Sequence, residues 1–171
     1  MKTIFLLRHA KSSWDDNSVP DHDRPLNDRG RAAAPRIGAY MRHAGYLPDL
    51  VLCSTATRTR QTLDAVLSEW EVEPVFDFEE SLYLADPGEM LDLVRSVPDT
   101  VEVVLLVAHN PGTGMLAAAL TGDGAPERIH LMRAKFPTAG LAIIELSVDR
   151  WKDTVSGCGS LKEFIRPRDL S

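Results

Sequence analysis

Short apolar runs, separated by polar and helical stretches, dominate the pattern of this chain. Runs that are nearly continuous in apolar residues predict strands buried on both faces at 4–7, 50–53, 103–108 and 141–146. Weaker strand signals lie around Val75 and at 161–165, and the latter is expected to pair with 141–146 as a terminal hairpin. These strands are sufficient for a central sheet.

The segments between the first predicted strands have the apolar periodicity of helices. A helix is predicted from about 28 to 44 and ended by Gly45. Because Pro35 has no backbone N–H, this helix is either kinked there or begins just before it. A second helix is expected to start close to Thr55, which places Arg58 in its first turn beside unpaired backbone amides.

Two further helices have recognisable starts. Asp86, followed by Pro87 and Glu89, has the form of a capping box and predicts a helix that runs to about 97. The next helix is expected to have Asn110 as its cap and Pro111 at its first position. Its predicted buried face consists of Met115, Leu116, Ala119 and Leu120.

The alternation of strands and helices predicts the fold class. It is typical of an α/β three-layer sandwich, in which helices flank a mostly parallel central sheet. A chain of 171 residues has the length of one domain, and no repeat or flexible linker divides it. We therefore expect a single domain spanning residues 1–171.

Composition narrows the class of protein. A formal net charge of −6 argues against a general nucleic-acid binder, which needs a basic face. The apolar residues between Lys2 and Arg8 are too few for a signal peptide or a membrane span, so we expect a cytoplasmic protein without a membrane partner. Cys53 and Cys158 lack the spacing of a disulfide framework or zinc site, and neither a metal nor a cofactor is expected.

Three predicted strands end in side chains that can bind an anion. Arg8 and His9 end the first strand, Arg58 follows the second, and His109 follows a later one. Because parallel strands in an open sheet build their ligand crevice at their carboxyl ends, these side chains are expected to converge there. The two arginines, a protonated His109 and the helix start after Asn110 would together hold a phosphoryl group.

His9 adds a nucleophile to this anion site. A neutral imidazole nitrogen can attack phosphorus and carry the phosphoryl group covalently, so that hydrolysis proceeds in two displacements. One ring N–H must then be donated to a protein acceptor, expected to be a backbone carbonyl, while the other nitrogen faces the ligand.

Other polar residues have simpler interpretations. Surface positions are expected for the remaining histidines and an acidic cluster: His22, His43, His130, Asp15, Asp16, Asp21 and Asp23. Arg24 and Arg29 either pair with these aspartates, which we favour, or reach the rim of the site. Three basic residues near a second long loop serve either solubility or recognition of a phosphorylated protein: Arg128, Arg133 and Lys135. Packing roles are expected for Trp14, Trp70 and Trp151.

The motifs resemble a known family. LLRHAKSSW at the start, DRPLNDRG, STATRTRQT and VAHNPG are similar, in order and spacing, to stretches of the histidine phosphatase (phosphoglycerate mutase-like) superfamily, and most closely to its SixA-type phosphohistidine phosphatases. The resemblance covers most of the chain, from Met1 to about 138 and again at 166–168. It implies the phosphoglycerate mutase-like fold, His9 as the phospho-acceptor, and further phosphate contacts from Arg8, Arg58, His109, Ser12 and Asn110.

One departure from the superfamily pattern bears on the substrate. Broader members carry a carboxylate general acid after the third strand, and here the expected position is closest to Tyr83 or Leu84. Glu80 and Asp86 are candidate replacements for this proton donor, although neither is in clear register. An alkoxide leaving group needs such a proton, whereas the imidazole of a phosphohistidine leaves more readily. The departure favours a phosphoramidate substrate.

The resemblance therefore implies a metal-independent phosphatase that acts through a covalent phosphohistidine. The expected substrate, and partner, is a protein phosphorylated on histidine. One alternative keeps the mechanism and takes small phosphate esters or nucleotides as substrates. The other alternative is a catalytically silent phosphate-binding module.

Overall fold

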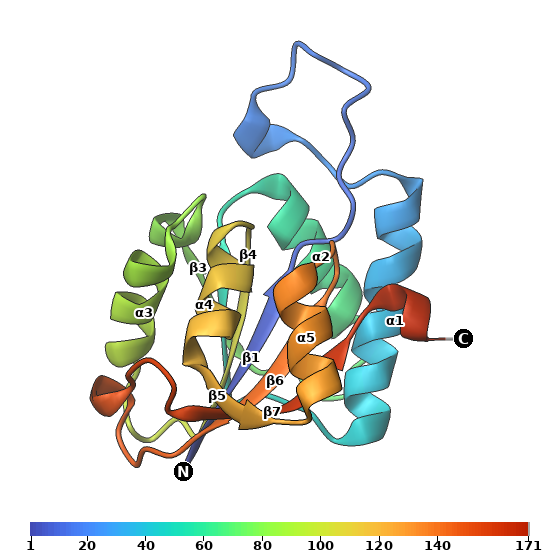
Figure 1. The fold of residues 1–171 in the computed structure, drawn as a ribbon. Helices are drawn as coiled ribbons and strands as arrows, with labels where there is room; N and C mark the ends of the chain where they lie inside the picture. The colour runs from blue at the N-terminus through green and yellow to red at the C-terminus, as the bar shows by residue number, and fades with distance from the viewer. Residues whose placement is uncertain (171) are drawn as a thin grey trace.

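The sheet at the centre of the molecule has seven strands. The computed structural model describes residues 1–170 (Figure 1). The strands are β1 (Lys2–Arg8), β2 (Leu50–Ser54), β3 (Val75–Glu79), β4 (Val103–Ala108), β5 (Thr121–Gly124), β6 (Leu141–Leu146) and β7 (Gly159–Ile165). They lie in the order β3-β2-β4-β1-β6-β7-β5. Strands β1 to β4 pair in parallel with one another, whereas β6 runs antiparallel to both β1 and β7. The predicted mostly parallel sheet and terminal hairpin are confirmed.

Helices cover both faces of this sheet. They are α1 (Asp28–Ala44), α2 (Thr57–Leu67), α3 (Pro87–Arg95), α4 (Gly112–Leu120) and α5 (Pro126–Ala134). Buried residues of α1 and α2 share one apolar cluster with the sheet, and those of α3, α4 and α5 share a second. In β1, Phe5 and Leu7 belong to the first cluster, while Ile4 and Leu6 belong to the second. Since successive strand residues face opposite sides, the two clusters lie on opposite faces, which confirms the three-layer sandwich.

Most of the helix ends and capping residues predicted from the sequence are found in the structure. Asn27 accepts a hydrogen bond from the Gly30 amide at the start of α1, and Gly45 ends this helix with φ of 79° in the left-handed region. The helix runs without interruption from Asp28 past Pro35, so the later start is wrong. At α3, Asp86 and Glu89 form the predicted capping box.

Three local predictions are wrong. The stretch 126–134, read as a loop, is the helix α5, and the short edge strand β5 was not foreseen. Helix α4 starts at Gly112 with Pro111 at its cap, although the Asn110 side chain still accepts a hydrogen bond from the Gly114 amide. Its buried face is rotated accordingly, and Met115 is 53% exposed. The cause is close packing, because a Cβ at Gly112 would lie 2.2 Å from the Ala85 carbonyl oxygen.

The carboxyl ends of β1, β2 and β4 meet at one edge of the sheet. Their register fixes this alignment, because Arg8 pairs with Ala108 in β4, and Cys53 of β2 pairs with Val107. The long segment between β1 and α1 extends beyond this edge at the top of Figure 1. No helix within residues 1–170 has both the length and the apolar character needed to cross a membrane.

Candidate active site

The side chains predicted to converge do line one cavity. It has a volume of about 320 Å³ and lies at the carboxyl ends of β1, β2 and β4. Its lining includes every residue that the motifs imply as a phosphate contact: Arg8, His9, Ser12, Arg58, His109 and Asn110. It also includes Arg24, for which contact with the rim of the site was the less favoured alternative, and residues without a predicted role in binding: Lys11, Trp14, Asp21, Leu84 and Thr138.

His9 is held in the predicted orientation. Its Nδ1 lies 2.7 Å from the Ala10 carbonyl oxygen, which can only accept, so Nδ1 carries the proton and Nε2 is the basic nitrogen. The side chain is 7% exposed. Burial, together with the positive charges of Arg58 and Arg8, lowers the pKa of His9 to about 4. The imidazole is therefore neutral near pH 7, as a nucleophile requires.

The backbone around His9 is fixed by its neighbours. The His9 amide donates to the Ala108 carbonyl of β4, and the Ala10 amide donates to the Thr62 hydroxyl of α2 at 2.9 Å. The Thr62 hydroxyl in turn donates to the Arg58 carbonyl. The nucleophile and Arg58 are thus tied to each other through Thr62, which sequence reasoning missed.

His109 is oriented by a serine hydroxyl. Its Nε2 lies 2.8 Å from Ser54 Oγ at the end of β2, and its ring centroid is 5.3 Å from that of His9. Burial and the neighbouring His9 lower the pKa of His109 to about 3. The expectation of a protonated His109 is therefore wrong for the unliganded cavity, although the negative charge of a phosphoryl group would raise this pKa. The contact with Ser54 leaves Nδ1 to face a ligand.

Two arginines bring positive charge to the cavity. Arg58 is 2% exposed, and its Nη1 and Nη2 donate to the Asp21 carbonyl and carboxylate at 2.7 and 3.1 Å. Arg8 Nη1 donates to the Phe136 carbonyl at 3.0 Å. Each terminal guanidinium nitrogen carries two hydrogens, so both arginines keep donors for an oxyanion.

Unpaired buried nitrogens gather at this cavity. Within residues 1–170, the buried side-chain nitrogens without a hydrogen-bond partner are Arg8 Nε, Arg58 Nε and His109 Nδ1. All three belong to residues that line the cavity. Since buried polar groups are nearly always paired, this cluster indicates a site built for an anionic ligand with several acceptor oxygens.

Asp21 and Arg24 were underestimated from the sequence. Asp21 is partly exposed, as expected for the acidic cluster, but it also contacts Arg58 and accepts a hydrogen bond from the Tyr83 hydroxyl at 2.5 Å. The Tyr83 hydrogen bond, with those from the arginines, lowers the pKa of Asp21 to about 2. Arg24 is 7% exposed; it makes the predicted ion pair with Asp21 and donates to Ser12 Oγ at 2.8 Å. The two residues form a charged wall of the cavity.

The segment that precedes β6 forms another wall. The Phe136 carbonyl accepts hydrogen bonds from both Arg8 and the Asn110 side chain. Ala139, with φ of 58° in the left-handed region, donates its amide to the carbonyls of Arg8 and His9, each at 3.0 Å. Such strained backbone in a non-glycine residue persists where the surroundings demand it, often at functional sites. Residues 136–140, which we call the strap, therefore anchor the end of β1.

The candidate proton donors Glu80 and Asp86 do not line the cavity. Glu80 is exposed in the short 3-10 helix Glu80–Leu82, and the Asp86 carboxylate caps α3. Leu84 and Tyr83 follow Glu80, and the Tyr83 ring packs edge-on against His109 at 5.5 Å. Among the described residues that line the cavity, Asp21 is the only carboxylate, and it is held ionised.

The remaining surface predictions have mixed outcomes. His43 and His130 are exposed as predicted, but the His22 ring is hydrogen-bonded to the Thr55 hydroxyl at 2.9 Å beside the site.

Trp70 and Trp151 are buried as expected, whereas Trp14 is 66% exposed and lies over the Arg24 guanidinium at 3.5 Å. Arg29 makes no ion pair with any aspartate of residues 1–170. No cluster of His, Cys, Asp and Glu in that range is arranged to hold a metal ion.

Comparison with known proteins places the chain in a family. The histidine phosphatase superfamily (branch 1) matches residues 4–82. An uncharacterized protein of Mycobacterium tuberculosis, Rv1276c, is 40% identical over 167 residues, which cover 95% of this chain and 100% of that protein. A structure assigned as the phosphohistidine phosphatase SixA of Agrobacterium tumefaciens is 31% identical with a TM-score of 0.82, covering 97% of this chain and 98% of that one. One from Nakamurella multipartitia, with the same assignment, has the same identity and TM-score and covers 97% and 96%.

This chain belongs to the histidine phosphatase superfamily, as its motifs predict. Within the superfamily it belongs to the SixA-type branch, whose fold it shares over nearly its whole length. The family and the two SixA structures support phosphatase activity.

Proposed function

We propose that this protein hydrolyses phosphohistidine on a partner protein through a covalent phosphohistidine at His9. The observation that carries the proposal is that no described residue lining the cavity offers a protonated carboxylic acid. Asp21, its one described carboxylate, accepts hydrogen bonds from Tyr83 and Arg58, and its pKa of about 2 keeps it ionised. A cavity without a carboxylic acid is suited to a leaving group that needs no strong acid, and imidazole is such a group.

In the first step, His9 Nε2 would attack phosphorus while the P–N bond of the substrate breaks. The electron pair of that bond stays on the leaving imidazole, which departs neutral if its other ring nitrogen carries a proton. Negative charge on the phosphoryl oxygens would be stabilised by Arg8, Arg58 and His109 Nδ1. Water would then attack phosphorus on His9, releasing phosphate and restoring the neutral imidazole with the same donors in place.

The test combines a labelled intermediate with a comparison of substrates. A histidine peptide carrying labelled phosphoryl groups is mixed with the protein and quenched in alkali, where phosphohistidine survives. We expect label on His9, and kcat/KM for the phosphohistidine peptide higher than for p-nitrophenyl phosphate or a nucleoside monophosphate.

Two histidine variants control this experiment. His9→Ala should lose both the label and turnover while retaining its circular dichroism spectrum and melting temperature. His130→Ala, which alters an exposed histidine of α5, should retain the parental rate. Faster turnover of monoesters would favour the small-ester alternative, and stoichiometric binding without turnover would favour the silent module; either result contradicts the proposal.

A further inference from the structure

A second pocket lies beside the catalytic cavity and is strongly basic. It has a volume of about 330 Å³ and shares Lys11 and Thr138 with the cavity, so the two adjoin. Five cationic side chains line it: Lys11, Arg29, Lys135, Arg166 and Arg168. None of its described lining residues is acidic, although the chain as a whole has a net charge of −6. We call it the basic pocket.

Most of this positive charge is not neutralised by the protein. Arg166 is paired with Asp169 at 2.9 Å. Lys11, Arg29, Lys135 and Arg168 make no ion pair within residues 1–170 and are all exposed. Like charges gathered in one hollow repel one another and so lower the stability of the folded protein. Because they do not stabilise the fold, we interpret them as a site that attracts an anionic ligand.

Arg29 also lies where a helix normally favours an acidic residue. It is the second residue of α1, where the exposed backbone amides already give the helix terminus a partial positive charge. A cation is disfavoured at this end of a helix, and acidic residues are preferred there. Stability of the helix therefore gives no reason for an arginine at this position.

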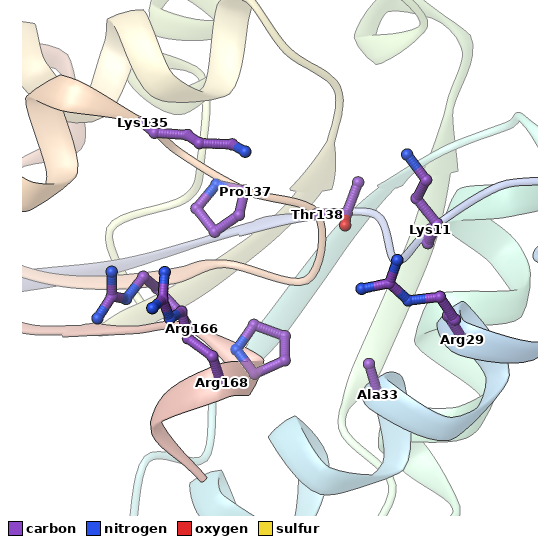
Figure 2. A pocket seen from close by; sticks show the side chains of 9 residues that line it. Lys11, Arg29, Ala33, Lys135, Pro137, Thr138, Arg166 and Arg168 are labelled. Carbon is purple, nitrogen blue, oxygen red and sulfur yellow. The ribbon is translucent and has the colours of Figure 1, made fainter.

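The cations surround the pocket rather than converge on one point. Figure 2 shows Lys11 and Arg29 on one side of the hollow and Arg166 and Arg168 on the other, with Lys135 reaching in from the end of α5. A site for a single phosphate would aim several donors at the same few oxygens. Spaced, exposed cations instead fit several carboxylates along an extended segment, which favours a protein over a small anion.

We infer that the basic pocket docks an acidic segment of the phosphorylated protein, next to the histidine whose phosphoryl group enters the catalytic cavity. This inference rests on the proposed function and adds the chemistry by which the partner is recognised. Exposed charges of this kind mainly raise the association rate and set specificity. The preference for an acidic partner should weaken as salt screens the charges.

The experiment uses two synthetic peptides of equal length with a central histidine. One has Asp and Glu around this histidine, and the other has Ser and Gln at the same positions. For the phosphorylated peptides, kcat/KM should be higher for the acidic one by about tenfold at low salt. Arg29→Glu combined with Arg168→Glu should remove this preference. Lys152→Glu combined with Arg150→Glu, which makes the same change in net charge at the opposite end of the sheet near Asp99, should retain it.

A binding measurement makes the inference independent of turnover. Fluorescence anisotropy is recorded for the unphosphorylated peptides with the parent protein and with the two charge-reversal proteins. Tighter binding of the acidic peptide that is lost only in Arg29→Glu/Arg168→Glu supports docking, even if the proposed hydrolysis fails. An equal affinity for both peptides, or an acidic preference that survives in Arg29→Glu/Arg168→Glu, overturns it. The affinity for pyrophosphate is measured in parallel as a probe of small-anion binding. If Arg29→Glu/Arg168→Glu loses affinity for pyrophosphate but not for the acidic peptide, the inference is also overturned.

Discussion

Arg58 and Arg60 lie two positions apart on α2 but face different surroundings. Arg58 is buried, touches Asp21 and lines the catalytic cavity. Arg60 donates to the Thr55 carbonyl and lies over the Phe78 ring, outside the cavity. The first turn of one helix thus supplies a cation to the site and another to the surface, which gives a matched pair for mutation.

We expect Arg58→Ala to lower kcat/KM by about 10²- to 10³-fold, equivalent to about 2.7–4 kcal/mol of lost transition-state stabilisation. The physical reason is the loss of a preorganised charge opposite the phosphoryl oxygens. Steady-state rates on the phosphohistidine peptide provide the measurement, with Arg60→Ala expected to stay within about twofold of the parent. A similar decrease in both variants would mean that general damage to α2, rather than phosphate contact, is responsible.

At the scale of elements, the side chains at the strand ends could be placed together from the sequence, because parallel pairing alone aligns the carboxyl ends of the strands. Arg8 and His109 could be placed together from two apolar runs, since their strands pair directly. The wall formed by Asp21 and Arg24 could not be predicted in the same way. It depends on how an irregular loop folds back onto α2 and Tyr83, which leaves no periodic signal.

The errors in α4 and α5 have equally local causes. The buried face of α4 is set by the contact of Gly112 with the Ala85 carbonyl, a tertiary constraint that periodicity does not contain. Helix α5 buries Met132 alone and has no clear apolar stripe, so a surface loop was the natural interpretation. Predicting such elements requires knowing which neighbour they pack against.

Helix α1 offers a test at this scale. Replacing Arg29 with Glu puts an anion at the positive end of the helix and should raise the free energy of unfolding by about 0.3–1 kcal/mol. Urea denaturation measures this change, and Arg29→Gln should give an intermediate value. A decrease in stability with Glu would show that Arg29 makes a stabilising contact, contrary to its unpaired state.

At the scale of the whole molecule, the two buried histidines make folding sensitive to acid. Their pKa values, about 4 for His9 and about 3 for His109, lie below the 6.5 expected in an unfolded chain. Between pH 6.5 and about 4 the unfolded chain therefore binds more protons, so stability falls as the pH falls through this window. Asp21, with its pKa lowered from 3.8 to about 2, adds a second loss only below pH 3.8.

We predict that the free energy of unfolding is lower at pH 5 than at pH 7.5 by about 2 kcal/mol for each buried histidine. Urea unfolding at the two pH values measures the difference. Replacing both His9 and His109 with Asn should remove most of it. A parent protein equally stable at both pH values would contradict the burial of neutral imidazoles.

The strap has a mechanical consequence for the molecule as a whole. Pro137 and Thr138 line the basic pocket, while the next residue, Ala139, donates its amide to the carbonyl of His9. A protein that binds in the pocket would contact the strap, which also holds the backbone at His9. The same short segment would thus position both the partner and the nucleophile, so a protein substrate would be aligned at two places where a small phosphorylated compound has only the catalytic cavity.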